Sequence, residues 1–493
     1  MTLNLTLLQT DYHDPWWIVL IKVVGFFVFL LVCMIVEVWF ERRAVGKMQH
    51  RLGPIMNGPF GLGQTVAEAM KLLFKEDFRP QGADRWLFSL APFISATAAF
   101  TAWSVIPIGG EVSLFGHTTS LQLTDLPMGV LFVLSIAAVG IYGIVLAGWS
   151  STSPYSTLGA IRSTAQMVSY EVAMGLSLVS VFLYSSTLTT SGIVASQGTE
   201  LAFLSGLHLP NWYWLPLLPA FVIYAISVVA ETNRAPFDLV ECEQELVSGY
   251  CTDYSGFRYA SFFLAEYLNM LTVSGMAATL FLGGYHAPWP FNRPVEVVDG
   301  VTVAGTGLLD HGFMAPVLDL LNSGWFSPVW FTLKVFVCVY VFVWLRGTLP
   351  RFRYDQFMNL GWRWLIPLSL GWIALMAVVL MVRWNHLLTR DVLLVALGLL
   401  VVLFLASLWL SRGSAPPQVR SEVSRRPEPD PAFDPWAGGY PVPPPPGAGR
   451  GRLEAAGGRP ALTPQPDDLV LVVAESGETT GPAAAATTDG KEV

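Results

Sequence analysis

The chain has 493 residues, of which 53% are hydrophobic and 13% are charged, and its mean hydropathy is +0.51. Soluble domains carry roughly 25% charged residues, so this composition excludes a string of soluble domains and predicts an all-α polytopic membrane protein. The net charge of −8 does not indicate a nucleic-acid partner, because much of the acid lies in one internal loop and the tail. No signal peptide is expected, and four scattered cysteines without a CxxC spacing predict no metal, iron–sulfur or disulfide site.

Nine apolar runs are long enough to cross a bilayer about 30 Å thick, which takes about 20 helical residues. Trp and Tyr stand at many of their ends, as is typical of the membrane interface. The ninth run is separated from the eighth by only a short polar break. The runs cover residues 16–39, 86–106, 127–149, 165–186, 212–230, 257–282, 328–346, 363–383 and 391–411.

Lys and Arg are distributed unequally between the two sets of connecting loops. The loops after runs one, three, five and seven hold fifteen of them, and the opposite loops hold three. Because basic loops stay in the cytoplasm, the first set is predicted to be cytoplasmic. The N-terminus is then outside, and with nine crossings the C-terminal tail is cytoplasmic.

The first cytoplasmic loop contains a predicted amphipathic helix over residues 62–74. Gln64, Glu68 and Lys71 recur at helical spacing along one stripe, and this helix is too short and too polar to span the bilayer. It either anchors the loop at the interface or roofs a cavity at the membrane surface. Arg42 and Arg43, which end the first run, are ordinary topology signals when judged by position alone.

The most unusual stretch is the cytoplasmic loop over residues 230–254. Six acids and one opposing Arg234 occur there, interleaved with apolar residues. Crowded carboxylates raise one another's proton affinity and titrate together, so the stretch is either a solvated acidic loop or a proton-handling site. Its continuity with membrane segments favours the second interpretation. The acids are Glu231, Asp238, Glu241, Glu243, Glu245 and Asp253.

Two further acids, Glu171 and Glu266, lie inside the fourth and sixth runs. An ionised carboxylate at bilayer depth costs about 2.5–3.5 kcal/mol on insertion scales, so each should be protonated, paired or beside a wet cavity. Each could be a structural hydrogen-bonding group between helices. Because they lie on separate helices, they could also converge with the acidic loop into one buried polar path.

The C-terminal part has a different composition. The last 81 residues contain 15 of the 34 prolines and are predicted to be disordered. The predicted organisation is a membrane domain over 1–385, an additional helix over 386–412 and a Pro/Ala/Gly-rich cytoplasmic tail over 413–493.

Four stretches resemble the H-type membrane subunits of bacterial proton-pumping NADH:quinone oxidoreductase, respiratory complex I, the counterparts of mitochondrial NADH dehydrogenase subunit 1. The similarity covers about residues 12–385. Position 68 is Glu where many relatives carry Asp, and the ninth run and tail extend beyond the family pattern. The stretches are ERRAVGKMQHRLGP at 41–54 with GPFGLGQTVAEAMKLLFKE at 58–76, YSTLGAIRSTAQMVSYEV at 155–172, AETNRAPFDLVECEQELVSGY at 230–250, and FFLAEYLNM at 262–270.

The resemblance implies a membrane subunit that forms the quinone chamber and couples quinone reduction to proton translocation. Arg42, Arg43, Glu68 and Lys71 would belong to the chamber, and Glu171, Glu266 and the loop acids with Arg234 to the proton path. The chain would bind quinone as substrate and hold no flavin, iron–sulfur cluster or metal. Its partners would be soluble and membrane subunits of the complex, in the bilayer of a bacterial inner membrane.

Three other interpretations stay open. The equivalent subunit of a membrane-bound energy-converting hydrogenase shares this ancestry, although the intact ETNRAPFDL and EQELVSGY favour complex I. A secondary transporter would show an inverted repeat, and none is evident in the sequence. A pure scaffold would tolerate neutralisation of Glu171 or Glu231.

Overall fold

The computed structural model describes residues 14–199, 210–238, 247–293, 295–298, 301–304 and 315–384. The chain divides into two compact units, Met1–Ala406 and Ser407–Val493, and every described residue belongs to the first. The predicted helix over 391–411 and the predicted disordered tail therefore lie outside the described residues.

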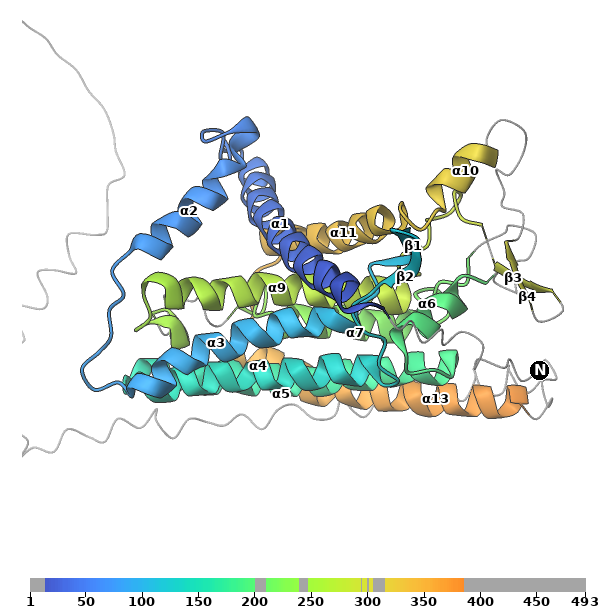
Figure 1. Ribbon diagram of the computed structural model, residues 1–493. Helices are drawn as coiled ribbons and strands as arrows, with labels where there is room; N and C mark the ends of the chain where they lie inside the picture. Colours follow the sequence, from blue (N-terminus) through green and yellow to red (C-terminus); the bar gives the residue numbers. More distant parts are fainter. Residues whose placement is uncertain are drawn as a thin grey trace, which may run out of the picture. The chain divides into compact units, whose positions relative to one another are not determined.

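The first unit is built mainly from long helices that pack side by side (Figure 1). The long helices are α1 (Trp16–Met48), α3 (Arg85–Ala102), α4 (Gly129–Ser150), α5 (Pro154–Ser185), α7 (Leu218–Glu231), α9 (Gly256–Phe281), α11 (Ser327–Thr348) and α13 (Ile366–Trp384). Shorter helices are η2 (Pro59–Gly61), α2 (Gly63–Phe74), η3 (Trp103–Val105), α6 (Thr190–Gln197), η5 (Gly249–Cys251), α10 (Ala315–Leu321), α12 (Tyr354–Asn359) and the π-helical η7 (Leu360–Leu365).

Two antiparallel hairpins complete the described part of the unit. One pairs β1 (Gly109–Leu114) with β2 (His117–Leu121), and the other pairs β3 (Val295–Val298) with β4 (Val301–Ala304). The fold is thus all-α in character, as predicted.

Each of the first eight apolar runs corresponds to a helix. Six described helices are long and apolar enough to cross a membrane: α1, α3 with η3, α4, α5, α11 and the continuous Tyr354–Met381. The fifth run forms α7, which has only 14 residues, and the sixth forms α9, which has 26 residues and contains Arg258 and Glu266. The polytopic architecture is confirmed, and the number of spans stays a prediction.

The main difference from the predicted elements is the start of α5. The fourth apolar run is predicted to begin at residue 165, whereas α5 already begins at Pro154. Proline suits the first helical position, because its fixed φ fits the helix and its missing N–H needs no partner there. Polar residues such as Ser156 and Gln166 are buried on this part of the helix and donate to backbone carbonyls of η5 and α7, so hydropathy alone places the helix start too late.

The predicted amphipathic helix is confirmed as α2, Gly63–Phe74. It packs against α1 and α9. Its Val66, Met70 and Leu73 are exposed, while Gln64 Nε2 donates to Glu68 Oε1 over 3.2 Å on the other stripe.

The loops after α1, α4, α7 and α11 meet at one end of the helix bundle. Hydrogen bonds between them join Phe78 N to Ser255 Oγ (2.9 Å), Asp84 N to Ser150 O (3.3 Å) and Phe352 N to Pro236 O (3.0 Å). This is the set of loops that carries most of the Lys and Arg. We call it the basic end; its assignment to the cytoplasm stays a prediction.

The opposite end, called the hairpin end, is formed by the β1–β2 hairpin, α6 and the segment that follows α9. Gln122 Nε2 donates to Thr190 Oγ1 over 3.0 Å, and Trp214 N donates to Phe281 O over 3.0 Å. The two alternating sets of loops therefore lie at opposite ends of the helix bundle, as their Lys and Arg content predicts.

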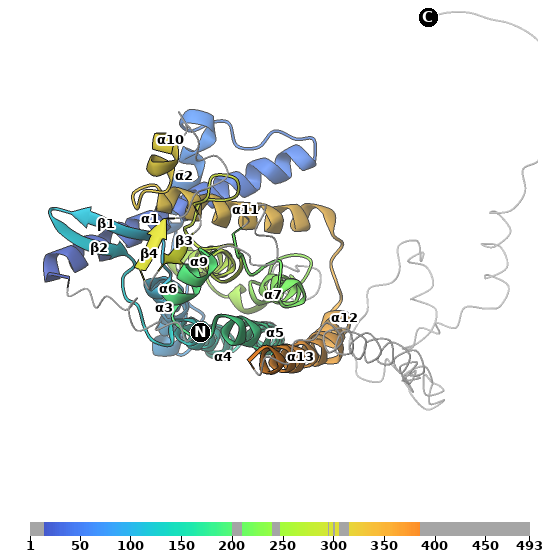
Figure 2. The same ribbon diagram turned by 90° about the vertical axis from the view of Figure 1, so that its right-hand side faces the viewer.

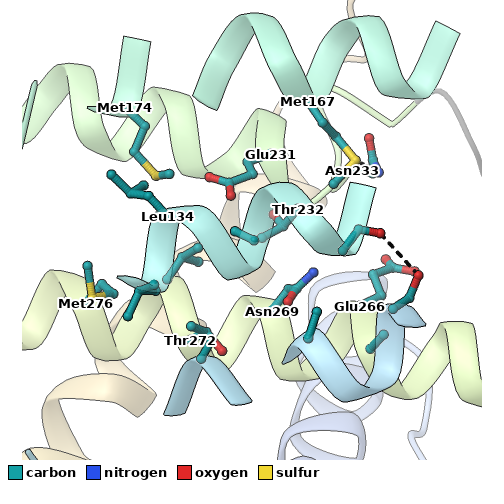
Figure 3. A pocket seen from close by; sticks show the side chains of 18 of the residues that line it. Leu134, Met167, Met174, Glu231, Thr232, Asn233, Glu266, Asn269, Thr272 and Met276 are labelled. Atoms are coloured by element: carbon teal, nitrogen blue, oxygen red, sulfur yellow. Dashed lines mark hydrogen bonds between the residues drawn. The ribbon is translucent and has the colours of Figure 1, made fainter. Parts of the chain in front are cut away.

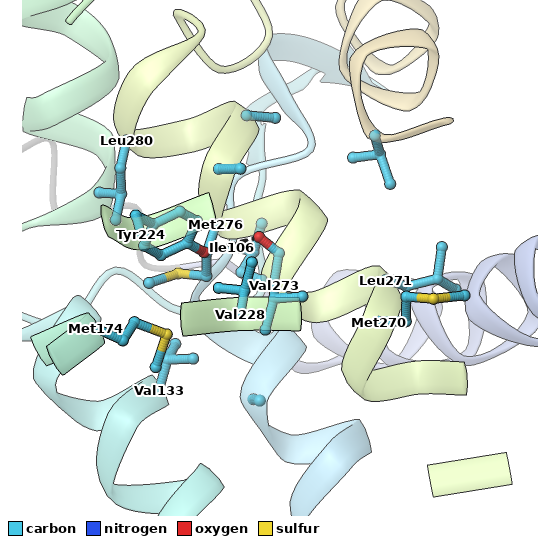
Figure 4. Packing of buried hydrophobic residues seen from close by; sticks show 14 of the residues in the cluster. Ile106, Val133, Met174, Tyr224, Val228, Met270, Leu271, Val273, Met276 and Leu280 are labelled. Atoms are coloured by element: carbon cyan, nitrogen blue, oxygen red, sulfur yellow. Dashed lines mark hydrogen bonds between the residues drawn. The ribbon is translucent and has the colours of Figure 1, made fainter. Parts of the chain in front are cut away.

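The helices bury a large apolar core and a second, smaller apolar cluster. The view along the bundle in Figure 2 shows α9 and α7 between the α1–α11 side and the α4, α5 and α13 side. Figure 4 shows part of this core, with Tyr224 and Val228 of α7 beside Val273 and Met276 of α9. Because these helices pack closely, the polar side chains among them have fixed neighbours.

Candidate functional site

The site is centred on Arg234, which follows α7 in the loop at the basic end. Only 3% of its surface is exposed. Its Nη1 lies 3.2 Å from Glu41 Oε1 on α1, and its Nε lies 3.0 Å from Glu266 Oε1 on α9. The guanidinium also stacks 4.4 Å from the ring centre of Tyr267. A buried guanidinium needs such partners, because an unpaired charge in this position would be strongly destabilising.

Glu41 is the second member of this cluster and is 4% exposed. Besides Arg234, it forms an ion pair with Arg346 of α11 and accepts a hydrogen bond of 2.7 Å from the Tyr267 hydroxyl. In the sequence, Glu41 is visible only as part of a topology signal, so its role in the cluster was not predicted. Arg234 and Arg346 are distant in sequence from Glu41, and no local sequence pattern predicts either contact.

A narrow cavity lies directly beside the cluster, between α3, α4, α5, α7 and α9 (Figure 3). It has about 60 Å³ of space for water, which is enough for roughly four to six molecules at about 10–15 Å³ each. Much of its lining is apolar, and the polar lining residues are Ser95, Tyr224, Glu231, Thr232, Asn233, Tyr250, Glu266, Asn269 and Thr272.

Glu231 and Glu266 face this cavity from α7 and α9. Glu231 is 8% exposed, and its Oε2 has no hydrogen-bond partner within the described structure. Glu266 contacts both the cavity and Arg234. A buried carboxylate oxygen beside a water-sized space can be satisfied by water, so this arrangement suits a carboxyl that exchanges protons.

The remaining predicted acids lie around this core of the site. Glu171 is partly buried on α5 and acts electrostatically on Glu231, although it is outside the cavity lining. Asp238 is buried and accepts from Arg351 Nη2 over 3.3 Å. Asp253 is partly buried, and burial raises its pKa above the ordinary value. Glu241, Glu243 and Glu245 lie outside the described residues.

A second feature is an open groove where the end of α1 meets α2. It encloses about 520 Å³ and is lined by Arg42, Arg51, residues 52–56, Gln64 and Glu68. Arg42 forms an ion pair with Glu68. Burial raises the pKa of Glu68, but hydrogen bonds from Arg42 and Gln64 outweigh that effect and the net pKa is lowered.

Arg43 and Lys71 differ from Arg42 in their surroundings. Arg43 donates to Phe60 O over 3.0 Å and lies 5.3 Å from the ring centre of Trp39, so it holds η2 against α1. Lys71 is exposed on α2 and does not line the groove. Of the four residues predicted for the quinone chamber, the structure thus brings two, Arg42 and Glu68, together in the groove.

Potential metal ligands are scattered through the described helices and loops. In the part of the chain that the structure describes, no group of three His, Cys, Asp or Glu side chains is arranged to hold a metal ion. The predicted lack of a metal, flavin or iron–sulfur cluster stays a prediction.

Comparison with known proteins places the chain in a family. The family described as NADH dehydrogenase matches residues 21–377. The H subunit of the NADH-quinone oxidoreductase of Cutibacterium acnes (strain DSM 16379 / KPA171202) is 50% identical over 438 residues, which is 87% of this chain and 92% of that protein. These matches confirm the resemblance carried by the four motifs, and the chain belongs to the NADH dehydrogenase family as an H-type membrane subunit of an NADH-quinone oxidoreductase.

Proposed function

We propose that this chain forms the membrane part of a quinone chamber and couples quinone reduction to proton translocation through its buried acids. The observation that carries the proposal is the double contact of Glu266. Its carboxylate pairs with Arg234 at 3.0 Å and also lines the cavity that contains Glu231. A change of charge at the Arg234 cluster can therefore reach the cavity through one side chain.

The groove at the α1–α2 junction is the proposed quinone entrance. It is open, it contains Arg42 and Glu68, and the neighbouring α2 exposes the apolar side chains of Val66, Met70 and Leu73. A quinone has a polar head and an apolar tail, so it suits a charged groove beside an apolar helix face in the bilayer. Arg43 holds η2 in place through Phe60 O, and Lys71 adds positive charge to α2. The head group would be reduced at a neighbouring soluble subunit.

The proton path would run from the Arg234 cluster into the membrane. Quinone reduction consumes protons and changes the charge in the chamber, and Glu41 and Glu266 then redistribute their pairing with Arg234. Water in the cavity would connect Glu266 to Glu231, and Glu171 would continue the path from α5. Asp238, Asp253, Glu241, Glu243 and Glu245 would provide proton-binding groups near the entrance.

The orientation follows from the same proposal. The basic end would face the bacterial cytoplasm and contact the soluble subunits, and the exposed apolar faces of the helices would contact lipid and the membrane-arm subunits. The N-terminus would be outside and the C-terminal tail cytoplasmic. The identity of 50% over most of both chains favours the quinone-linked enzyme over an energy-converting hydrogenase or a transporter.

The test is Glu231→Gln in the intact complex, in membranes. We expect assembly on a native gel and NADH oxidation by a hydrophilic artificial acceptor to persist, whereas quinone reduction and pumping collapse. Asp319→Asn is the matched control, because this acid lies on the exposed α10 and pairs with Arg293 away from the site. If Glu231→Gln and Asp319→Asn both behave like wild type, the acidic path does not include Glu231.

A further inference from the structure

The inward face of α1 carries a second carboxyl that the family motifs do not include. Cys33, Glu37 and Glu41 follow one another at spacings of four, so they form one stripe along the helix. All three are buried. Glu37 therefore lies one turn from the Glu41 carboxylate and faces the same interior.

Glu37 and Glu41 differ in their hydrogen bonding. Glu41 is held by Arg234, Arg346 and the Tyr267 hydroxyl. Glu37 has 0% exposure, and within the described structure neither of its carboxylate oxygens has a hydrogen-bond partner. An ionised carboxylate without donors is strongly disfavoured in an apolar interior, whereas a neutral acid is tolerated. The geometry thus favours the protonated form of Glu37.

Charge balance in the cluster leads to the same result. Arg234 and Arg346 supply two positive charges, and Glu41 and Glu266 supply two negative charges that pair with them. Among the described residues, Glu37 adds a carboxyl to these pairs without a cationic partner of its own, so its ionised form would add an unpaired buried charge. The protonated form of Glu37 avoids that charge.

We propose that Glu37 is a further proton-carrying residue, which holds a proton while Glu41 and Glu266 bind Arg234 and gives it to one of them when the chamber changes charge. This inference rests on the proposed function. The step conserves protons and charge: the O–H bond of the Glu37 acid breaks, an O–H bond forms on Glu266 or Glu41, and the negative charge moves to Glu37.

Arg234 can follow this movement of charge. Its Nη2 has no hydrogen-bond partner among the described residues, so this group can donate to a further carboxylate. Arg234, Glu41 and Glu266 act electrostatically on Glu37, and Glu37 in turn acts on Cys33. The charged and titratable groups on the elements packed around this part of α1 are Cys33, Glu41 and Arg42 on α1, Glu68 and Lys71 on α2, Arg234 after α7, Glu266 and Tyr267 on α9, and Cys338, Tyr340 and Arg346 on α11.

The experiment is infrared difference spectroscopy of the purified complex, between the oxidised and the NADH-reduced state, in H₂O and D₂O. The C=O stretch of a protonated carboxyl is sensitive to this exchange. On reduction, we expect the wild type to lose the carboxylic-acid band of Glu37 and to gain one from Glu266 or Glu41, and Glu37→Gln to lack the band that is lost. Cys33→Ala, one turn away on the same buried stripe, should keep it. In proteoliposomes, Glu37→Gln should pump severalfold fewer protons per electron.

Glutamine can donate and accept hydrogen bonds, so a purely structural role for Glu37 predicts a wild-type spectrum and wild-type pumping in Glu37→Gln. That result would overturn the inference. If Glu37→Gln does not assemble, Glu37→Asp keeps the acid and should shift the band in frequency; an unshifted band would assign it to another residue and again reject the inference.

The parallel variant Glu231→Gln separates the two proposals. If Glu231→Gln abolishes coupling while Glu37→Gln keeps the band and the pumping, only the role of Glu37 is wrong. If Glu231→Gln leaves coupling intact and Glu37→Gln lacks the band, the proposed path through the cavity is wrong while Glu37 still carries a proton.

Discussion

The buried positive charges near the two ends of α9 have different kinds of partner. Towards the basic end, Glu266 and Glu41 pair with Arg234. At the hairpin end, Lys334 of α11 donates to three carbonyl oxygens, those of Leu282, Gly284 and His286, at 2.7–2.9 Å. Carboxylates can take up a proton and carbonyl oxygens cannot. The acceptors of the first cluster can therefore exchange protons, whereas those of the second cannot.

The hairpin end is also more rigidly connected. Gln197 of α6 donates to Thr279 O over 2.9 Å and accepts from Gly283 N over 2.8 Å, and the Lys334 ammonium lies 4.4 Å from the Trp212 ring centre. These contacts satisfy the last carbonyls of α9, as a cation near a helix C-terminus does. The comparison predicts that mutations at the basic end change activity as well as stability, whereas those at the hairpin end change stability alone.

The largest effect is expected from Arg234→Met. The substitution leaves Glu41 and Glu266 without their buried partner, and breaking a buried pair in this way costs about 3–5 kcal/mol. We expect little assembled complex on a native gel and no quinone reduction in what remains. Arg234→Lys keeps the charge but loses the two-pronged contact, so it should assemble better and reduce quinone slowly. Equal loss in both variants would show that charge alone is insufficient.

The matching change at the hairpin end is Lys334→Met. It removes three charge-assisted hydrogen bonds and leaves their carbonyls to be satisfied by other groups, and we expect a loss of about 2–3 kcal/mol. Thermal stability of the detergent-solubilised complex should fall, while protons pumped per electron stay at the wild-type value. A loss of pumping in fully assembled Lys334→Met would contradict the distinction between carboxylate and carbonyl partners.

The sequence could predict those features of the fold and the site that neighbouring residues determine. Apolar runs located eight described helices, and the local stripe of Gln64, Glu68 and Lys71 located α2, because these signals are carried by neighbouring residues. The acids of the loop after α7 were also visible, since charge is rare in this chain. Such features need no knowledge of how the helices pack.

The partners of those acids could not be predicted. Glu41 and Arg234 are 193 residues apart, and Glu41 and Arg346 are 305 residues apart. Only the packing of α1 against α9 and α11 brings them together. The two-residue motif after Glu41 resembles an ordinary topology signal, and the isolation of Glu37 is evident only once every donor around it has a position.

His286 at the hairpin end provides a pH test. Its Nε2 lies 3.2 Å from Val194 O, and burial together with the charge of Lys334 lowers its pKa to about 4. Between pH about 6.5 and about 4 the unfolded chain then binds more protons than the folded chain, so stability falls as the pH falls through this window. At pH 5 the loss is about 2 kcal/mol. In His286→Gln, the melting temperature should depend less on pH in this window. An unchanged dependence would mean that other groups cause it.

The smallest effect on stability is expected at the groove, from Glu68→Gln. The Arg42–Glu68 pair is about one-third exposed, so its contribution is about 0–1 kcal/mol and is screened by salt. Because the pKa of Glu68 is lowered, that contribution is present above the unfolded value and lost as the pH falls through the folded one. We expect unchanged assembly and melting, but a raised KM for quinone that Glu68→Asp partly restores. A wild-type KM in Glu68→Gln would move the entrance away from this groove, whereas a raised KM without a loss of stability would show that a weak, exposed pair can still position substrate.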